Sequence, residues 1–332
     1  MTVGIRLLYR RYGLRPRDSD FYIEDGNIVL VADSEKDNCA VLFRLHKSIL
    51  MKHSTVFADM FSMPSPPNVE KYDDVPLVRM AGDDADALRD FMKLLYNPEC
   101  ISTIFNANDF TTKLLGPCKM ARKYQVDWIR NMAVECLQNS WPSTVLGWRE
   151  FAEEENAQVM RAIQGDPDPR WDDPTSPPRV LPEPVSSILL ARECDVTAVL
   201  PLAFLDLLQR LPEPHPMDQY DEYYKKADLN LLPADDWRRL FRARERMAAW
   251  FRYYPSSPPY DLRPCLSGKS CEATVHRIWL KFGNQLGVCG DILRISLEHE
   301  MEKMCAACKS RLEAEVGTLQ GEFLRELPNF FC

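Results

Sequence analysis

The sequence lacks the features that mark membrane-spanning and secreted proteins, and it has few of the loops that build catalytic clefts. No apolar run in its 332 residues approaches the ~20 residues that cross a bilayer. Its start has neither an apolar secretory segment nor a cleavage site, and no G-x-S-x-G motif occurs in it. A formal net charge of -8 disfavours phosphate binding, so nucleic acid is not the expected partner. We expect no membrane association and a location in the cytoplasm or the nucleus.

Cysteine, by contrast, is abundant. Eleven cysteines on a chain without a recognisable signal sequence do not indicate a disulfide framework, because the number is odd and the compartment is expected to be reducing. Five of them stand alone, several among apolar residues, which is typical of small core side chains. These five are Cys39, Cys100, Cys118, Cys136 and Cys194.

Proline-rich stretches divide the chain into regions. Residues 165–184 have no periodic apolar pattern and their prolines remove backbone donors, which predicts a linker. The predicted organisation is a flexible basic arm at 1–18, a domain at 19–141, a connecting helix and proline-rich linker at 142–184, a helical region at 185–254, and a cysteine-containing helical region at 265–331.

Short strands are predicted in the first domain. Residues 26–32 (GNIVLVA) and 40–45 (AVLFRL) are β-branched and aliphatic runs separated by a polar tip, which predicts a hairpin. A third strand is predicted at 75–80, where Pro76 favours a strand start or an edge. Residues 88–96 then place apolar side chains at helical spacing after an acidic first turn.

The stretch FRLHKSILMKHSTVFADMF, residues 43–61, predicts a strand followed by two short helices. Ser54 lies between two apolar patches, where its hydroxyl can cap the second helix. His46, together with Ser54 and Asp59, invites a catalytic interpretation. A structural interpretation is stronger, in which His46 opens the first helix and closes a local hydrogen bond, and we expect no enzymatic activity.

Four segments together closely resemble a BTB/POZ domain: DGNIVLVA, FRLHKSILMKHSTVFADMF, LRDFMKLLYN and KYQVDWIRNMAVECL. The pattern looks most similar to the expanded group of such proteins in mushroom-forming (basidiomycete) fungi, and it covers residues 19–141. The positions that match the family, here called the signature set, are His46, Leu50, Ser54, Phe57, Met60, Phe61 and Tyr124.

The resemblance implies an α+β fold in which a small sheet packs on a helical cluster, here followed by an all-α C-terminal region. It implies a protein-interaction module that pairs with itself or with another BTB protein. In some families of this kind the domain docks on a cullin ubiquitin ligase, which suggests a substrate-adaptor role by analogy. The alternative is a transcriptional regulator whose C-terminal region contacts DNA, although the sequence has no two-Cys-two-His finger array.

Two cysteine pairs in the last region indicate a metal site. Cys265 and Cys271 are six positions apart, and Cys305 and Cys308 have the i, i+3 spacing that places two thiolates on one helix face. Four thiolates would hold a structural, tetrahedral zinc ion. Substitute ligands are His276, Cys289 and His299. The alternative is a set of buried thiols packed between helices, and no other cofactor is indicated.

The region after the linker has a helical pattern throughout. Helices are predicted at 185–193, 197–211, 233–251 and 303–327, the last ending before Pro328. The third of these interleaves arginines with aromatic residues, which superficially resembles a nucleic-acid surface. We assign its arginines to a solvated face instead. The residues assigned to the buried face are Leu240, Phe241, Met247 and Phe251.

Overall fold

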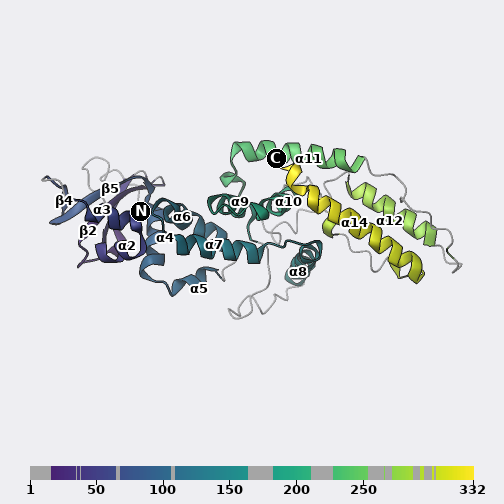
Figure 1. Cartoon of the computed structure of the whole chain (residues 1–332), viewed down its shortest axis with the longest axis horizontal. Coiled ribbons are helices and arrows are strands. Elements are labelled where there is room, and N and C mark those ends of the chain that lie inside the picture. The colour runs from purple at the N-terminus through teal and green to yellow at the C-terminus, as the bar shows by residue number, and fades with distance from the viewer. Residues whose placement is uncertain are drawn as a thin grey trace. The chain divides into compact units, whose positions relative to one another are not determined.

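The computed structural model describes residues 16–34, 36–37, 39–64, 68–105, 109–163, 182–210, 227–252, 265, 271–286, 292–294, 301–302 and 304–332. These residues belong to two compact units (Figure 1). The first unit contains the chain up to Cys136 together with Leu189–Asp195, and the second contains Leu137–Ile188 and Val196–Cys332. The first unit thus takes in a segment that follows the predicted linker, and most of the predicted basic arm lies outside the described residues.

A mixed sheet forms one layer of the first unit. Its strands are β1 (Arg17–Tyr22), β2 (Ile28–Ser34), β3 (Cys39–Leu45), β4 (Lys71–Tyr72) and β5 (Val75–Asp84), in the order β1-β3-β2-β5-β4. The strands β2 and β3 form the predicted antiparallel hairpin, in a register from Ile28 opposite Leu45 to Ser34 opposite Cys39. The third predicted strand is β5, which runs parallel to β2 and carries Pro76 at its start.

The sequence pattern did not predict β1, whose residues RDSDFY are mostly polar. This strand lies at an edge and runs parallel to β3. Only Asp18 and Phe21 are buried in it, so it lacks the apolar alternation that would identify a strand. The predicted arm therefore ends two residues too late, because Arg17 and Asp18 are already part of the sheet.

The sheet is curled, so that strands at its opposite edges meet. The tip between β4 and β5 has Asp73 and Asp74 at positive φ, as a two-residue hairpin turn requires. The Asp73 carboxylate accepts hydrogen bonds from Arg17 of β1 at 2.7 Å and from the Tyr22 hydroxyl at 2.6 Å. Burial and this bond raise the pKa of Tyr22 to about 12. The curl encloses an apolar cluster of Val29, Val31, Leu42, Val75 and Leu77.

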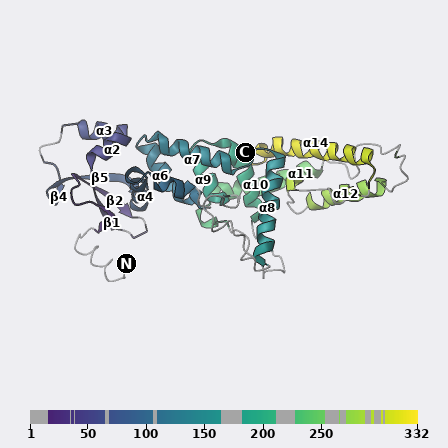
Figure 2. The ribbon, with the colours of Figure 1, turned by 90° about the horizontal axis from the view of Figure 1, so that it is seen from below.

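Helices complete the first unit: α2 (Lys47–His53), α3 (Thr55–Ser62), α4 (Ala85–Tyr96), α5 (Cys100–Phe105), α6 (Phe110–Lys123) and α7 (Asp127–Ser140, whose end belongs to the second unit). In Figures 1 and 2, α2, α3 and α4 lie beside the sheet. The predicted stripe of α4 forms the centre of this core, with Leu88, Phe91 and Met92 fully buried. Asp84 caps the helix by accepting from the backbone N–H groups of Asp86 and Ala87.

The segment Leu189–Asp195 contacts the helices of the first unit. Its Glu193 and Asp195 pair with Arg122 at 3.6 Å and Arg130 at 3.1 Å. The thiols of Cys118 and Cys194, both buried as predicted, hydrogen-bond to each other, and this bond together with burial raises the pKa of Cys118. The first unit therefore includes a piece of chain far along the sequence.

The second unit is helical throughout the part of it that the structure describes. Its elements are α8 (Val145–Ile163), α9 (Pro184–Glu193, whose end belongs to the first unit), η2 (Thr197–Val199), α10 (Leu200–Arg210), η4 (Leu229–Leu231), α11 (Ala234–Arg252), α12 (Cys271–Leu286), η5 (Ile292–Arg294) and α14 (Ala306–Phe330). The α+β fold class with an all-helical C-terminal region is thus confirmed. Within the described ranges, no helix is both long and apolar enough to cross a membrane.

Aromatic rings form the contact between α11 and α14. Phe323 is buried and packs against Phe251, Trp250 and Phe330, with ring centroids 5.4 to 5.7 Å away. From α11, Arg246 donates to the last backbone carbonyls of the chain, at 2.6 Å for Cys332. This arginine satisfies acceptors that a helix end leaves without partners.

Two sequence predictions in this unit are wrong. The last helix does not stop before Pro328 but continues through it to Phe330. A proline in the final turn disturbs only that turn, because it removes one N–H donor and crowds one preceding carbonyl. Phe241 is 66% exposed, whereas Leu240, Ala243, Met247 and Phe251 are buried. Each helical residue turns by ~100°, so the neighbour of Leu240 points away from the buried face.

Candidate functional site

His46 lies at the start of α2 and joins parts of the domain that are far apart in sequence. It is the N-cap residue, but its side chain makes no capping bond, so the predicted local bond is wrong. Its backbone N–H donates to the Tyr96 hydroxyl at 2.8 Å, and its ring Nδ1 lies 3.3 Å from the same hydroxyl. The other ring nitrogen, Nε2, lies 3.1 Å from an Asp25 oxygen. The imidazole is therefore held by α4 and by the β1–β2 turn.

The β1–β2 turn itself fits closely against β3. Gly26 is buried, and a Cβ at this position would lie 2.9 Å from the backbone carbonyl carbon of Arg44. The Arg44 Nε donates to the Gly26 carbonyl at 2.8 Å. Only glycine allows this approach of two backbones, which explains its place at the start of the GNIVLVA segment.

Ser54 links two signature elements. Its hydroxyl oxygen accepts from the Phe57 N–H at 3.1 Å, which confirms the predicted cap of α3. The same hydroxyl donates to the Tyr124 carbonyl at 2.6 Å. The Phe57 ring stacks on the Tyr124 ring at 4.4 Å, so a capped helix and the end of α6 form one contact.

Tyr124 is also bound to Asp83, a residue outside the signature set. The buried Asp83 carboxylate accepts from the Tyr124 hydroxyl and from the Lys123 ammonium, the latter at 2.5 Å. Burial, and then this bond to a carboxylate, raises the pKa of Tyr124 well above its ordinary value. In the sequence, Asp83 stands only in the acidic run before the predicted helix at 88–96, and the structure places it at the end of β5.

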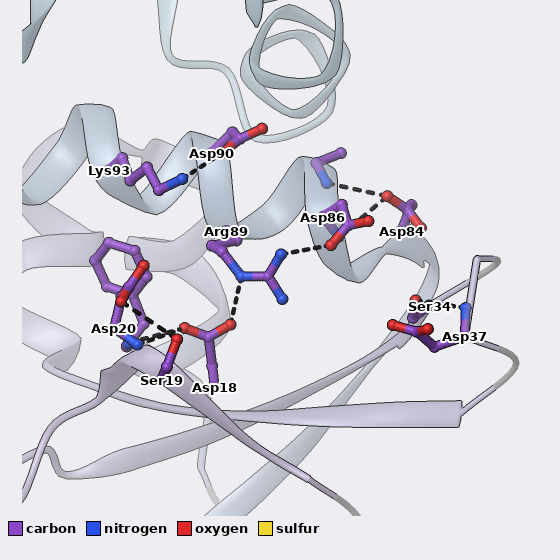
Figure 3. A network of polar contacts seen from close by, with 12 residues as sticks. Asp18, Ser19, Asp20, Ser34, Asp37, Asp84, Asp86, Arg89, Asp90 and Lys93 are labelled. Carbon is purple, nitrogen blue, oxygen red and sulfur yellow. Dashed lines mark hydrogen bonds and ion pairs between the residues drawn. The ribbon is translucent and has the colours of Figure 1, made fainter. Parts of the chain in front are cut away.

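A second buried carboxylate, Asp18, is paired in the same way (Figure 3). One Asp18 oxygen accepts from the backbone N–H groups of Asp20 at 3.0 Å and Phe21 at 2.9 Å. The other accepts from Arg89 Nε at 2.6 Å, and Arg89 also binds Asp86 on its own helix. This arrangement attaches β1 to α4, and no local pattern in the sequence indicates it.

The signature set is thus mostly structural. Leu50 and Phe57 are fully buried, and Ser54 and Tyr124 are nearly so. The remaining signature residues His46, Met60 and Phe61 are partly exposed. An exposed strip remains on α2, formed by Ser48, Met51 and Lys52, and Met51 is 38% exposed.

In the second unit the four predicted cysteines come together. The Sγ atoms of Cys265, Cys271, Cys305 and Cys308 all lie within 4.8 Å of one another. The Sγ atoms of Cys265 and Cys305 are 3.7 Å apart, and the Cys305 backbone N–H donates to Cys271 Sγ at 3.4 Å. Of the substitutes, His276 is exposed and is not in the group, while Cys289 and His299 lie outside the described residues.

Helix ends surround these thiols. Cys271 is the first residue of α12, Cys305 is the N-cap of α14, and Cys308 lies in the first turn of α14. Burial, and then hydrogen bonds with Cys305 and Cys265, raise the pKa of the Cys308 thiol to about 12. The arrangement has the chemistry of a soft-metal site, because four sulfur donors converge on one point.

A comparison with protein families finds a BTB/POZ domain at residues 27–140. The match lies within the predicted boundaries of 19–141. Neither the curated proteins nor the solved structures that were searched give a match to this chain. The resemblance to the fungal group in particular therefore stays a prediction.

The chain carries a BTB/POZ domain. Domains of this family are in general interaction modules rather than enzymes, and they associate with themselves or with other proteins. The buried carboxylates and the Ser54 cap described above hold the domain together. The strip on α2 formed by Ser48, Met51 and Lys52 is exposed to solvent.

Proposed function

We propose that this protein is a non-enzymatic interaction protein that dimerises through its BTB/POZ domain and presents its helical C-terminal region to a second partner. The observation that supports this most directly is the BTB/POZ domain itself at residues 27–140. The strip on α2 formed by Ser48, Met51 and Lys52 is the contact that we assign to dimerisation. An apolar Met51 between two polar residues suits a surface that is buried only on association.

Sedimentation equilibrium of the full chain at micromolar concentration tests the dimer. We expect the wild-type chain to be dimeric and Met51→Glu to weaken the dimer at least tenfold, since an unpaired carboxylate in an interface costs about 1.4 kcal/mol or more. Met160→Glu is the matched control, because Met160 is an exposed methionine on α8 in the other unit. A wild-type chain that stays monomeric at every concentration contradicts self-association.

A substrate-adaptor role on a cullin ubiquitin ligase is the finer form of this proposal. It is supported by analogy with other BTB proteins, and its test is direct binding of the purified chain to a cullin N-terminal domain. Saturable binding that Met160→Glu leaves unchanged would support it. If the chain does not bind the cullin but binds DNA in an electrophoretic mobility-shift assay, the result would instead support the alternative of a transcriptional regulator that contacts DNA.

A further inference from the structure

We propose that Cys265, Cys271, Cys305 and Cys308 bind one structural zinc ion, which joins three separate parts of the helical second unit. This inference does not depend on the BTB domain or on its partners. The four residues come from a segment before α12, from the start of α12, and from the start of α14. Two of the cysteine pairs are close in sequence, Cys265 with Cys271 and Cys305 with Cys308, but the first pair is at least 34 positions away from the second.

The distances match a single tetrahedral ion. Zinc binds thiolates at about 2.3 Å, and a regular tetrahedron with that bond length has sulfur atoms about 3.8 Å apart. The Sγ atoms of Cys265 and Cys305 are 3.7 Å apart, and all four sulfurs lie within 4.8 Å. The side chains therefore need to move by no more than about 1 Å to complete the coordination sphere.

Other uses of four close cysteines fit less well. A disulfide requires a sulfur–sulfur distance of about 2.05 Å, so Cys265 and Cys305 at 3.7 Å are not joined by one. An iron–sulfur cluster holds its cysteines around two or more metals and bridging sulfides, which spreads them further apart than one ion does. Convergence of all four sulfurs within 4.8 Å therefore favours one ion.

The surrounding backbone favours thiolates. On binding, each thiol gives its proton to solvent, and four thiolates with Zn²⁺ carry a net charge of −2. Cys271 and Cys305 lie at the N-terminal ends of α12 and α14, where the helix dipoles are positive. The Cys305 N–H already points at Cys271 Sγ at 3.4 Å, a contact that helps to orient a ligating sulfur.

The ion would hold α12 and α14 together at one end. These helices lie side by side in Figures 1 and 2. At the other end of α14, the aromatic cluster around Phe323 and the bonds from Arg246 attach it to α11. The sequence between Cys271 and Cys305 is 33 residues long, so the zinc would close a long loop between the starts of α12 and α14.

The first test is the metal content of the full chain. The protein is purified in reducing, chelator-free buffer, and its metals are measured by inductively coupled plasma mass spectrometry. We expect about one zinc per chain, and a loss of most of it in Cys305→Ser and in Cys308→Ser. The matched control is Cys332→Ser, because Cys332 is an exposed cysteine of the same unit that lies outside the group. We expect this variant to keep its zinc. Iron with sulfide in place of zinc overturns the proposal.

The second test keeps the proposal falsifiable if the serine variants do not fold. The wild-type chain is stripped of metal with a chelator and titrated with Co²⁺, whose d–d absorption reports tetrahedral thiolate coordination. We expect saturation at about one cobalt per chain and displacement by a small excess of Zn²⁺. A stripped, still folded chain that takes up neither Co²⁺ nor Zn²⁺ overturns the proposal.

Discussion

The two units of this protein close their cores by different means. In the first, a curled sheet and the helices beside it bury a continuous apolar core, and each buried carboxylate described above has a cationic partner. In the second, helices separated by long segments bury apolar side chains such as Ile278, Leu312 and Val316, and they meet in addition through an aromatic cluster and through four thiols. Helices joined by long loops gain more from a cross-link than elements joined by short turns, because the cross-link closes a longer loop.

Removal of metal should therefore distinguish the units most strongly. Free zinc about ten-thousand-fold above the dissociation constant adds about 5 kcal/mol to the free energy of unfolding. We expect a chelator to speed amide hydrogen exchange in α12 and in the first turns of α14, and to leave α4 unchanged. Equal acceleration in α4 and α12 would mean that the two units do not differ in this way.

Truncation of a core side chain in the first unit should destabilise that unit and not the second one. Phe57→Ala removes a fully buried ring that stacks on Tyr124 and Phe61, and we expect a loss of about 3–5 kcal/mol from the first unit. Chemical unfolding measures the loss, and hydrogen exchange assigns it to a unit. The control is Met51→Ala on the exposed strip, which should cost little. A Phe57→Ala chain as stable as the parent would contradict the assignment of this core.

Loss of a buried carboxylate should have a smaller effect. Asp83→Ala leaves the Tyr124 hydroxyl without its acceptor and the Lys123 ammonium without its counter-ion. We expect a loss of about 1–3 kcal/mol, at the lower end because Lys123 is partly exposed and regains water. Glu70→Ala, which breaks the exposed pair with Arg79, should cost under about 1 kcal/mol. Equal losses in the two variants would show that burial of Asp83 has no special role.

The smallest effect should come from a histidine of the first unit. Burial, and then the charge of Lys52, lower the pKa of His53 from its ordinary value of 6.5. The unfolded chain therefore binds this proton more tightly, so the contribution to stability is present above pH 6.5 and is lost as pH falls toward the lowered pKa. We expect His53→Gln to reduce the fall in stability between neutral and mildly acidic pH. Chemical unfolding at several pH values across that range measures the effect. If the free energy of unfolding falls equally in the variant and the parent, the prediction is contradicted.

Local patterns were enough to predict much of the first unit. A hairpin, a capped helix and an amphipathic helix each need only residues within a few positions of one another, so the strands β2 and β3, the Ser54 cap and the stripe of α4 were all predicted. The convergence of the four cysteines was predicted as well, because spacing and residue type together indicate a soft-metal site. That a metal binds there is still a prediction.

Other features depended on contacts that no short stretch contains. Asp18 and Arg89 are 71 positions apart, and Asp83 and the Tyr124 hydroxyl are 41 apart. A polar residue in the sequence does not reveal whether it will be buried, and a buried carboxylate takes whichever donor the folded chain brings to it. The polar strand β1 also depends on contacts between residues that are far apart in the sequence. Asp18 pairs with Arg89 of α4, and Arg17 and Tyr22 bind the Asp73 carboxylate at the far edge of the curled sheet.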